Sequence, residues 1–242
     1  MSTPTSRATV DKYSESAAIY RAHSEVFSDD LDYYLRFCRG FCTLDMFAGY
    51  GRVTNHLARH GVDVEAVELN ADLARQIALD ASRVHVADVL TFAPPRRFAR
   101  VVAAYNSFCL LTEPDDVMRF FARLAGLLEV GGRASLNYYS VDRWPDAVAY
   151  SFRFEGGEVR YTPSFDLTAR DRKLGVWIDA YATDAATFTH RYEVRIYEDA
   201  GDVTALAAGT GLELVAVTYE FDLPEERVLE PGWVDYVFER VA

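Results

Sequence analysis

Apolar residues follow two different patterns along the chain. Between residues 41 and 140, short apolar runs are separated by segments whose apolar residues recur every three or four positions. The runs predict buried β-strands and the segments between them predict amphipathic helices. This order favours right-handed crossovers and an α/β fold with a doubly wound, mostly parallel sheet. The predicted strands are residues 41–47, 62–69, 83–89, 100–108 and 133–140, and the predicted helices are residues 51–60, 71–81 and 113–128.

The pattern differs on both sides of this central part. Residues 11–40 carry apolar residues and tyrosines at helical spacing, which predicts N-terminal helices. After residue 140 the chain is rich in strand-forming, aromatic and charged residues, and Glu155–Glu158 is typical of a hairpin turn. We therefore expect an antiparallel β insertion with strands at residues 148–155, 158–166, 173–182 and 188–197. A helix at 199–209 and strands at 212–222 and 233–241, the last antiparallel, would complete a seven-stranded sheet.

Composition excludes several classes of protein. The chain has 242 residues, with 25 basic against 37 acidic ones and a net charge of −12. A surface this acidic repels phosphate, so we expect neither nucleic acid nor an anionic membrane as a partner. The three cysteines complete neither a disulfide framework nor a zinc site, and no metal site is expected. With no apolar signal core and no membrane-spanning run, the expected location is the cytoplasm.

The stretch from Leu44 to Asn70 contains the most informative motif. A predicted strand contains Asp45, a turn holds Gly49 and Gly51, and the next strand ends at Glu68. Glycines let the backbone approach a ligand, and the following helix N-terminus offers unpaired amides. An acid at the end of the second strand can accept hydrogen bonds from the two hydroxyls of a ribose. With Asp88 after the third strand, the pattern predicts a nucleoside-containing cofactor.

Two common nucleotide motifs are incomplete here. The third glycine of a nicotinamide-binding fingerprint is replaced by Thr54, and no phosphate-binding Gly-Lys-Ser/Thr motif occurs. At this point "LDMFAGYGR" resembles the first motif of the class I S-adenosylmethionine-dependent methyltransferases. The resemblance covers residues 41–140 well and implies their Rossmann-like fold, with S-adenosylmethionine as cofactor.

The resemblance also implies a role for each matching residue. Asp45 is the first of the expected cofactor-binding residues, and the loop after it, with Phe47, Ala48, Gly49 and Gly51, would contact the methionine part of the cofactor. Phe47 stands where the family has its first glycine, so its side chain would narrow that pocket. The remaining cofactor-binding residues would be Glu68 on the ribose, Leu69 packed on the adenine, Asp88 and Val89 on the adenine edge, and Tyr105 beneath the reactive methyl.

The parts outside the core resemble those of small-molecule methyltransferases of bacterial natural products, including antibiotic sugars. In those relatives the N-terminus and the insertion cover the active site. Tyr13 and Tyr20 lie where the N-terminal segment closes over the cofactor, and Tyr20 is expected to bind it. "AYNSF" (104–108) also lacks the motif of DNA amino-methylating members. We therefore expect a small-molecule substrate in secondary metabolism. The expected parts are a helical lid (1–40), a cofactor-binding core (41–140), the β insertion as lid or interface (141–198) and the end of the core sheet (199–242).

Several side chains are candidates for acid–base chemistry. His190, on the last inserted strand, and Tyr139, at the end of the fifth core strand, are the first two, and His23 follows. His56 and His60 are expected on a solvated helix face, and His85 within a strand. Arginines on the insertion could bind an acidic group of the substrate, but interleaved acids favour cross-strand ion pairs instead. These arginines are Arg153, Arg160, Arg191 and Arg195, and the acids are Glu155, Glu158, Asp166 and Glu193.

Three functions stay open at this stage. The first is a small-molecule methyltransferase acting on oxygen, nitrogen or carbon. The second is an enzyme of the same fold that catalyses a cyclisation or an elimination, a possibility that Phe47 and the missing obvious base keep in view. The third is a partner subunit. Aromatic residues of the insertion could form a homo- or hetero-oligomeric interface or could line the substrate pocket; these are Phe152, Phe154, Tyr161, Trp177 and Tyr181.

Overall fold

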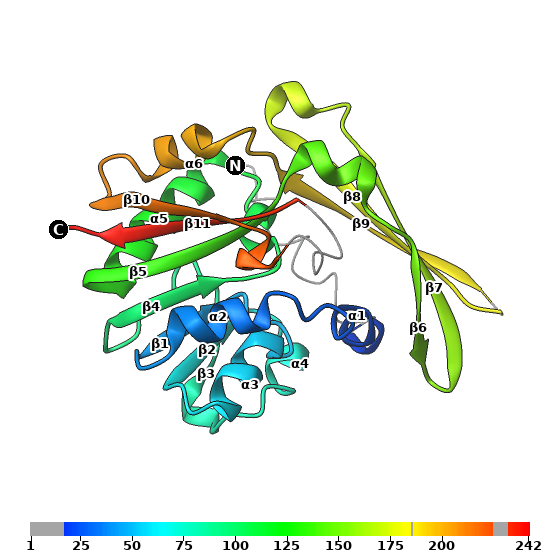
Figure 1. Cartoon of the computed structure of the whole chain (residues 1–242), viewed down its shortest axis with the longest axis horizontal. Helices are drawn as coiled ribbons and strands as arrows, with labels where there is room; N and C mark the ends of the chain where they lie inside the picture. The colour runs from blue at the N-terminus through cyan, green and yellow to red at the C-terminus, as the bar shows by residue number, and fades with distance from the viewer. Residues whose placement is uncertain (1–16, 185, 225–231) are drawn as a thin grey trace, which may run out of the picture.

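The core of the protein is a seven-stranded sheet in the order β10-β11-β5-β4-β1-β2-β3 (Figure 1). The computed structural model describes residues 17–184, 186–224 and 232–242. Six strands run in the same direction, and β11 alone lies antiparallel, between β5 and β10. This confirms the predicted doubly wound sheet and its antiparallel last strand. The strands are β1 (Thr43–Met46), β2 (Val64–Glu68), β3 (Val84–Val86), β4 (Phe98–Ala103), β5 (Leu128–Tyr139), β10 (Leu212–Tyr219) and β11 (Trp233–Arg240).

Helices cover both faces of this sheet. α2 (Leu31–Cys38) packs on α3 (Arg52–Arg59), and α5 (Pro114–Leu127) packs on α6 (Ala200–Ala207). Figure 1 shows the first pair in front of the sheet and α5 behind it. Their apolar faces enclose a core of fully buried aliphatic and aromatic side chains, and removing that surface from water drives the assembly. No helix in the described ranges is long and apolar enough to span a membrane.

Several element ends differ from the sequence prediction, among them that of β4, which ends at Ala103 rather than at residue 108 because Tyr105 and Asn106 have left-handed backbone. The helix predicted at 71–81 is a single turn, α4 (Ala71–Ala74), because the amide of Ala78 donates to the side chain of Asn55 (2.8 Å) instead of continuing a helix. β5 begins at Leu128 rather than at residue 133, since Leu128 already pairs with Phe98. β10 ends at Tyr219 because the next three residues have left-handed backbone.

The insertion forms a separate antiparallel sheet in the order β6-β7-β8-β9. Its strands are β6 (Tyr150–Phe154), β7 (Gly157–Asp166), β8 (Leu174–Ala182) and β9 (Thr187–Arg195). Glu155 and Gly156, with φ of 49° and 81°, form the two-residue hairpin between β6 and β7. Two successive positive φ values define a type I′ turn, whose twist matches the strands. The predicted insertion and its hairpin turn are confirmed.

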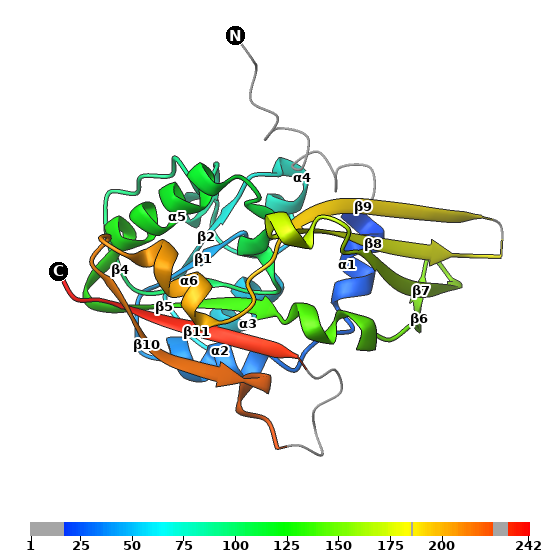
Figure 2. The same ribbon diagram turned by 90° about the horizontal axis from the view of Figure 1, so that it is seen from above.

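The inserted sheet projects beyond one end of the core, and α1 (Ala17–Ser24) lies against it (Figure 2). Ile19 of α1 is buried among Phe152, Val159, Tyr161 and Tyr181. The connection from β5 to the insertion carries Trp144, which is fully buried and packs against Trp177 with a ring distance of 5.3 Å. The N-terminal helix and the core thus hold the inserted sheet from two sides. The N-terminal helices expected over residues 11–40 are α1 and α2 in the described part, and Tyr13 lies outside the described residues.

A buried ion pair fastens the α1–α2 connection to the core. Both guanidinium Nη atoms of Arg52, in the first turn of α3, donate to Asp30 (2.6 Å each), and Nη1 also reaches the carbonyl of Phe27 (3.2 Å). The side chain of Asp30 is fully enclosed and that of Arg52 is 11% exposed. A bidentate arginine–carboxylate pair with these short distances combines charge attraction with fixed geometry.

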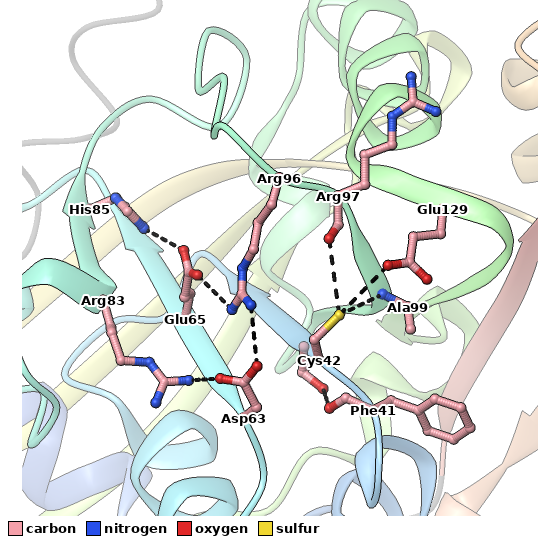
Figure 3. Close-up of polar contacts among 11 residues, drawn as sticks. Phe41, Cys42, Asp63, Glu65, Arg83, His85, Arg96, Arg97, Ala99 and Glu129 are labelled. Carbon is pink, nitrogen blue, oxygen red and sulfur yellow. Dashed lines mark hydrogen bonds and ion pairs between the residues drawn. The ribbon is translucent and has the colours of Figure 1, made fainter.

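The opposite end of the parallel strands carries a second ionic network (Figure 3). Arg96 pairs with Asp63 (3.2 Å) and with Glu65 (2.6 Å), Arg83 pairs with Asp63, and His85 contacts Glu65 (2.8 Å). These contacts join β2, β3 and the segment before β4, so His85 has the structural place that its position within a strand suggested. All three cysteines are free thiols, and the described residues hold no cluster of metal-ligating side chains.

Replacing Asp30 should destabilise the protein far more than replacing an exposed acid. In Asp30→Asn the guanidinium of Arg52 stays buried without its countercharge, and we expect the free energy of unfolding to fall by about 3 kcal/mol. Asp142 pairs with Arg170 at 3.1 Å with its own side chain 68% exposed, so Asp142→Asn should cost about 0.5 kcal/mol. Urea unfolding of both variants measures the difference. Equal losses would contradict the role given to the buried pair.

Candidate functional site

The loop after β1 brings backbone amides to the carboxyl edge of the sheet. Phe47, Gly49 and Gly51 all have left-handed backbone, with φ of 58°, 59° and 89°. At Gly51 a Cβ atom would lie 3.0 Å from Ile77 and 3.1 Å from Asn55, so this position requires glycine for its conformation and for its space. Phe47 adopts the same conformation at an energetic cost for a bulky residue, while its ring packs 5.9 Å from that of Phe120.

Glu68 at the end of β2 is held by this loop. Its Oε2 accepts a hydrogen bond from the amide of Gly49 (2.7 Å), and its Oε1 accepts one from the amide of Asn70 (2.8 Å). Burial raises the pKa of Glu68 above its ordinary value, although these amides act in the opposite direction. A carboxylate can accept about four hydrogen bonds, so both oxygens retain capacity for further donors. The arrangement fits two neighbouring hydroxyl groups.

Asp45 lies beneath the loop, outside the wall of the main cavity. Its Oδ2 accepts a hydrogen bond from the hydroxyl of Thr54 (2.6 Å), and burial raises its pKa to about 7. With Ala48, whose amide donates to Val67 (3.0 Å), it borders a small void of about 30 Å³. The structure therefore gives Asp45 a place from which it supports the loop and α3. It also shows why threonine occupies position 54, which the sequence pattern marked only as a missing glycine.

A cavity of about 240 Å³ opens next to the loop, lined by residues of the core sheet and of the inserted sheet. Asp88 lies in its wall, with Oδ1 accepting from the amide of Leu90 (2.8 Å), and Leu69 presents a 40% exposed side chain there. Asp45, Ala48, Gly51 and His190 are not part of this wall. The residues predicted from the sequence that line it are Tyr20, His23, Phe47, Gly49, Glu68, Leu69, Asp88, Val89, Tyr105, Tyr139, Tyr161 and Trp177.

The end of β4 forms the floor of the cavity. Tyr105 and Asn106 have left-handed backbone with φ of 55° and 58°. Asn106 is fixed to β5, because its amide donates to Asn137 (3.2 Å) and its side-chain oxygen accepts from the amide of Tyr139 (3.2 Å). The ring of Tyr105 stacks on Trp233 at 5.7 Å. The strained backbone is thus held by tertiary contacts, which turn Tyr105 and Asn106 toward the space above the sheet.

The far wall of the cavity comes from α1 and the inserted sheet. Asp179 of β8, 5% exposed, accepts hydrogen bonds at Oδ1 from the hydroxyl of Tyr161 (3.0 Å) and from Nε1 of Trp177 (2.8 Å). His23 of α1 contacts the hydroxyl of Tyr181 at 2.6 Å, and its ring lies 4.1 Å from that of Tyr161. His23, Tyr161, Trp177 and Asp179 all line the cavity.

Sequence reasoning ranked His23 low and missed Asp179. The signal was present in the alternation of β8, where Gly175, Trp177, Asp179 and Tyr181 share one face. A single acid on an aromatic face of a strand is unusual and marks a buried or ligand-binding position. One strand cannot show whether such an acid has a countercharge or faces a cavity, so the pattern alone did not identify a site.

His190 occupies a different place from the one expected. It pairs with Asp179 in the register of β8 and β9, and its ring lies 6.0 Å from that of Tyr181 and 6.2 Å from that of Phe188. It belongs to the same face as the cavity-lining Tyr192. A base role for His190 stays a prediction, as it does for Tyr139, which lines the cavity directly.

The arginines that the sequence analysis named as candidates do not line the cavity. By strand alternation Arg153, Arg160 and Arg191 belong to the outer face of the inserted sheet and are exposed, whereas Nη1 of Arg195 donates to the carbonyl of Thr112 (3.2 Å). Within the described ranges no ion pair joins these arginines to the interleaved acids, so the expected cross-strand ion pairs are not formed. His56 and His60 stack on one face of α3 at 4.4 Å.

The whole chain was compared with known proteins and solved structures. No protein-family model matches the chain, and no curated protein does. An S-adenosylmethionine-dependent methyltransferase from Clostridium acetobutylicum superposes with a TM-score of 0.72 at 15% identity, over 95% of this chain and 99% of its own. A sugar N-methyltransferase from a Streptoalloteichus species gives 0.73 at 22% identity, over 93% and 92%. An amino pentose methyltransferase from Micromonospora echinaspora, involved in calicheamicin biosynthesis, gives 0.68 at 18% identity, over 92% and 95%.

These similarities show that the chain has the Rossmann-like fold of S-adenosylmethionine-dependent methyltransferases, as the resemblance in its sequence implied. They extend over the N-terminal helices and the inserted sheet as well as the core, because nearly the whole of each chain is covered. The likeness concerns fold.

The burial of His23 should make the protein less stable in acid. Burial lowers the pKa of His23 to about 4, whereas histidine in an unfolded chain titrates near 6.5. The unfolded state therefore binds the proton more readily, and stability is lost as the pH falls from about 6.5 toward 4. From about pH 7 to about pH 5, the wild type should lose about 2 kcal/mol more than His23→Gln. Urea unfolding at both pH values measures this, with exposed His60→Gln as the control that should follow the wild type.

Proposed function

We propose that the protein is an S-adenosylmethionine-dependent methyltransferase that acts on a small molecule in bacterial secondary metabolism. The observation that carries this proposal is the position of Glu68, held by the amides of Gly49 and Asn70 at the carboxyl edge of the sheet with hydrogen-bonding capacity left over. The fold supports it, as does the description of two structural neighbours as sugar or amino pentose methyltransferases.

The residues around the cavity suit the parts of this cofactor. Glu68 would hold the ribose hydroxyls, and Asp88 with the amide of Val89 would bind the adenine edge, against which Leu69 packs. The loop from Phe47 to Gly51 would border the methionine portion. When bound, the cofactor supplies a methyl group on a positively charged sulfur, which reacts by in-line displacement. The chain contributes the alignment of the acceptor and the exclusion of water.

The aromatic wall performs that exclusion. Tyr105, Tyr139 and Trp233 enclose the cavity on the core side, and Tyr150 and Tyr161 enclose it on the side of the inserted sheet. Aromatic side chains packed around the reacting atoms limit the access of water to the acceptor and strengthen electrostatic interactions nearby. Positioning alone can supply a large part of the rate enhancement of a displacement, so the proposal does not depend on a dedicated base.

Loss of the Glu68 contacts should weaken cofactor binding selectively. In Glu68→Gln one oxygen becomes an NH2 group that faces a backbone amide, and the charge that accepts the hydroxyl hydrogen bonds disappears. We expect the dissociation constant for S-adenosylhomocysteine to rise by about tenfold or more in calorimetric titration. Glu65→Gln is the matched control, since Glu65 lies on the same strand at its far end and pairs with Arg96. Its affinity should equal that of the wild type.

The same titration separates the alternatives. Wild-type protein that binds neither S-adenosylmethionine nor S-adenosylhomocysteine would overturn the proposal. Binding without methyl transfer to any acceptor would favour a non-methylating enzyme or a partner subunit, and the side chain of Phe47 in the cavity wall is the feature that would then require explanation.

A further inference from the structure

The lining of the cavity is strongly one-sided in charge. Of the described residues that form it, five are carboxylic acids, and none is arginine or lysine. Glu68 and Asp88 lie on the side assigned to the cofactor, whereas Asp179 lies on the opposite side, in the inserted sheet. The remaining acids are Glu113, which is exposed, and Asp116, which pairs with Arg119. A cavity with this balance favours cations over neutral or anionic ligands.

Asp179 is buried although no positively charged side chain of the described residues pairs with its carboxylate. It is 5% exposed, and its hydrogen-bond partners, Tyr161 and Trp177, are both neutral donors that share one oxygen, Oδ1. Among the described residues no basic side chain forms an ion pair with it. Burying an ionised carboxylate is costly unless a countercharge or several hydrogen bonds compensate. Oδ2 is therefore available for a positively charged donor from the cavity.

The surroundings of Asp179 add a second preference for a cation. Tyr150, Tyr161 and Trp177 line the cavity together with it, and ring faces attract ammonium groups in desolvated sites. His23 in the same wall supplies no compensating charge at neutral pH, because burial lowers its pKa to about 4. Arg153, Arg160 and Arg191 belong to the outer face of the inserted sheet, and Arg195 donates to the carbonyl of Thr112 (3.2 Å) without lining the cavity. The charge of the lining, the burial of Asp179 and the aromatic rings beside it thus all favour a cationic ligand.

We propose that the acceptor is an aliphatic amine and that the carboxylate of Asp179 binds its nitrogen. This inference rests on the proposed function and specifies its substrate class. The ammonium form binds to Asp179 and loses one proton to water. The nitrogen lone pair then forms the N–C bond as the C–S bond of the cofactor breaks, and the electron pair of that bond stays on the sulfur. The product is the N-methylated ammonium ion, so the positive charge moves from sulfur to nitrogen.

A matched pair of probes tests the charge preference. Cyclohexylamine and cyclohexanol differ in one group of nearly equal size, and only the amine is charged at neutral pH. We expect the wild type, titrated by nuclear magnetic resonance, to bind the amine about tenfold more tightly than the alcohol. In Asp179→Asn this ratio should fall to within about twofold. The asparagine keeps an oxygen for Tyr161 and Trp177, so the wall retains its hydrogen bonds.

Glu193→Gln is the control for the loss of one negative charge. Glu193 lies on β9 of the same sheet but is exposed on its outer face, and its removal should leave the amine preference unchanged. If the preference for the amine fell equally in both variants, it would arise from the overall negative potential of the protein rather than from a contact with Asp179. That result would overturn the proposal. So would a wild-type ratio near one, which decides the question even if the Asp179 variant does not fold.

Titrations with and without S-adenosylhomocysteine keep the two proposals apart. If the nucleoside binds and the amine shows no preference over the alcohol, the amine inference fails and the methyltransferase proposal stands. If the amine is preferred and neither nucleoside binds, the methyltransferase proposal fails, and with it the assignment of the amine as a methyl acceptor.

Discussion

The buried pair between Arg52 and Asp30 determines how the N-terminal segment meets the rest of the molecule. Arg52 belongs to the first turn of α3, directly after the glycine loop, and its guanidinium also lies 5.3 Å from the ring of Tyr105 and 5.4 Å from that of Phe27. One side chain therefore joins the loop, the end of β4 and the α1–α2 connection. Because α1 carries Tyr20 and His23 into the cavity wall, the composition of that wall depends on a contact made outside it.

Two kinds of chemistry meet in the cavity. On the core side, recognition rests on backbone amides and on acids that close strands, a geometry imposed by a parallel sheet whose loops emerge at one edge. On the side of the inserted sheet, recognition rests on aromatic side chains and one enclosed carboxylate. The residues on the core side can change little without disturbing the turn at Gly51. The second kind depends on side chains of two long antiparallel strands, where a substitution alters the surface and leaves the backbone in place.

Periodicity predicted the fold well because it reports local burial. The strand and helix alternation, the insertion and the turn at Gly156 follow from spacing and turn chemistry within short windows, and Glu68 was found because its place relative to the glycines is fixed by topology. The prediction failed where distant residues decide the outcome. The helix after Asn70 ends early because Asn55 takes the amide of Ala78, and the ion pairs expected on the insertion are absent from its described part. Asp179 faces the cavity only because α1 and three strands of the insertion pack together around it, and the sequence of one strand does not contain that information.

The alternation of β8 and β9 has a consequence for how the protein can diversify. Only every second residue of these strands faces the cavity, and the residues between them face outward, so one long strand supplies about four positions that touch a ligand. Mutations at those few positions could redirect the choice of acceptor while the glycine loop, the acid on β2 and the buried core continue unchanged. The cavity-facing residues of the inserted sheet can therefore change quickly during evolution. The outward-facing residues between them must stay compatible with folding.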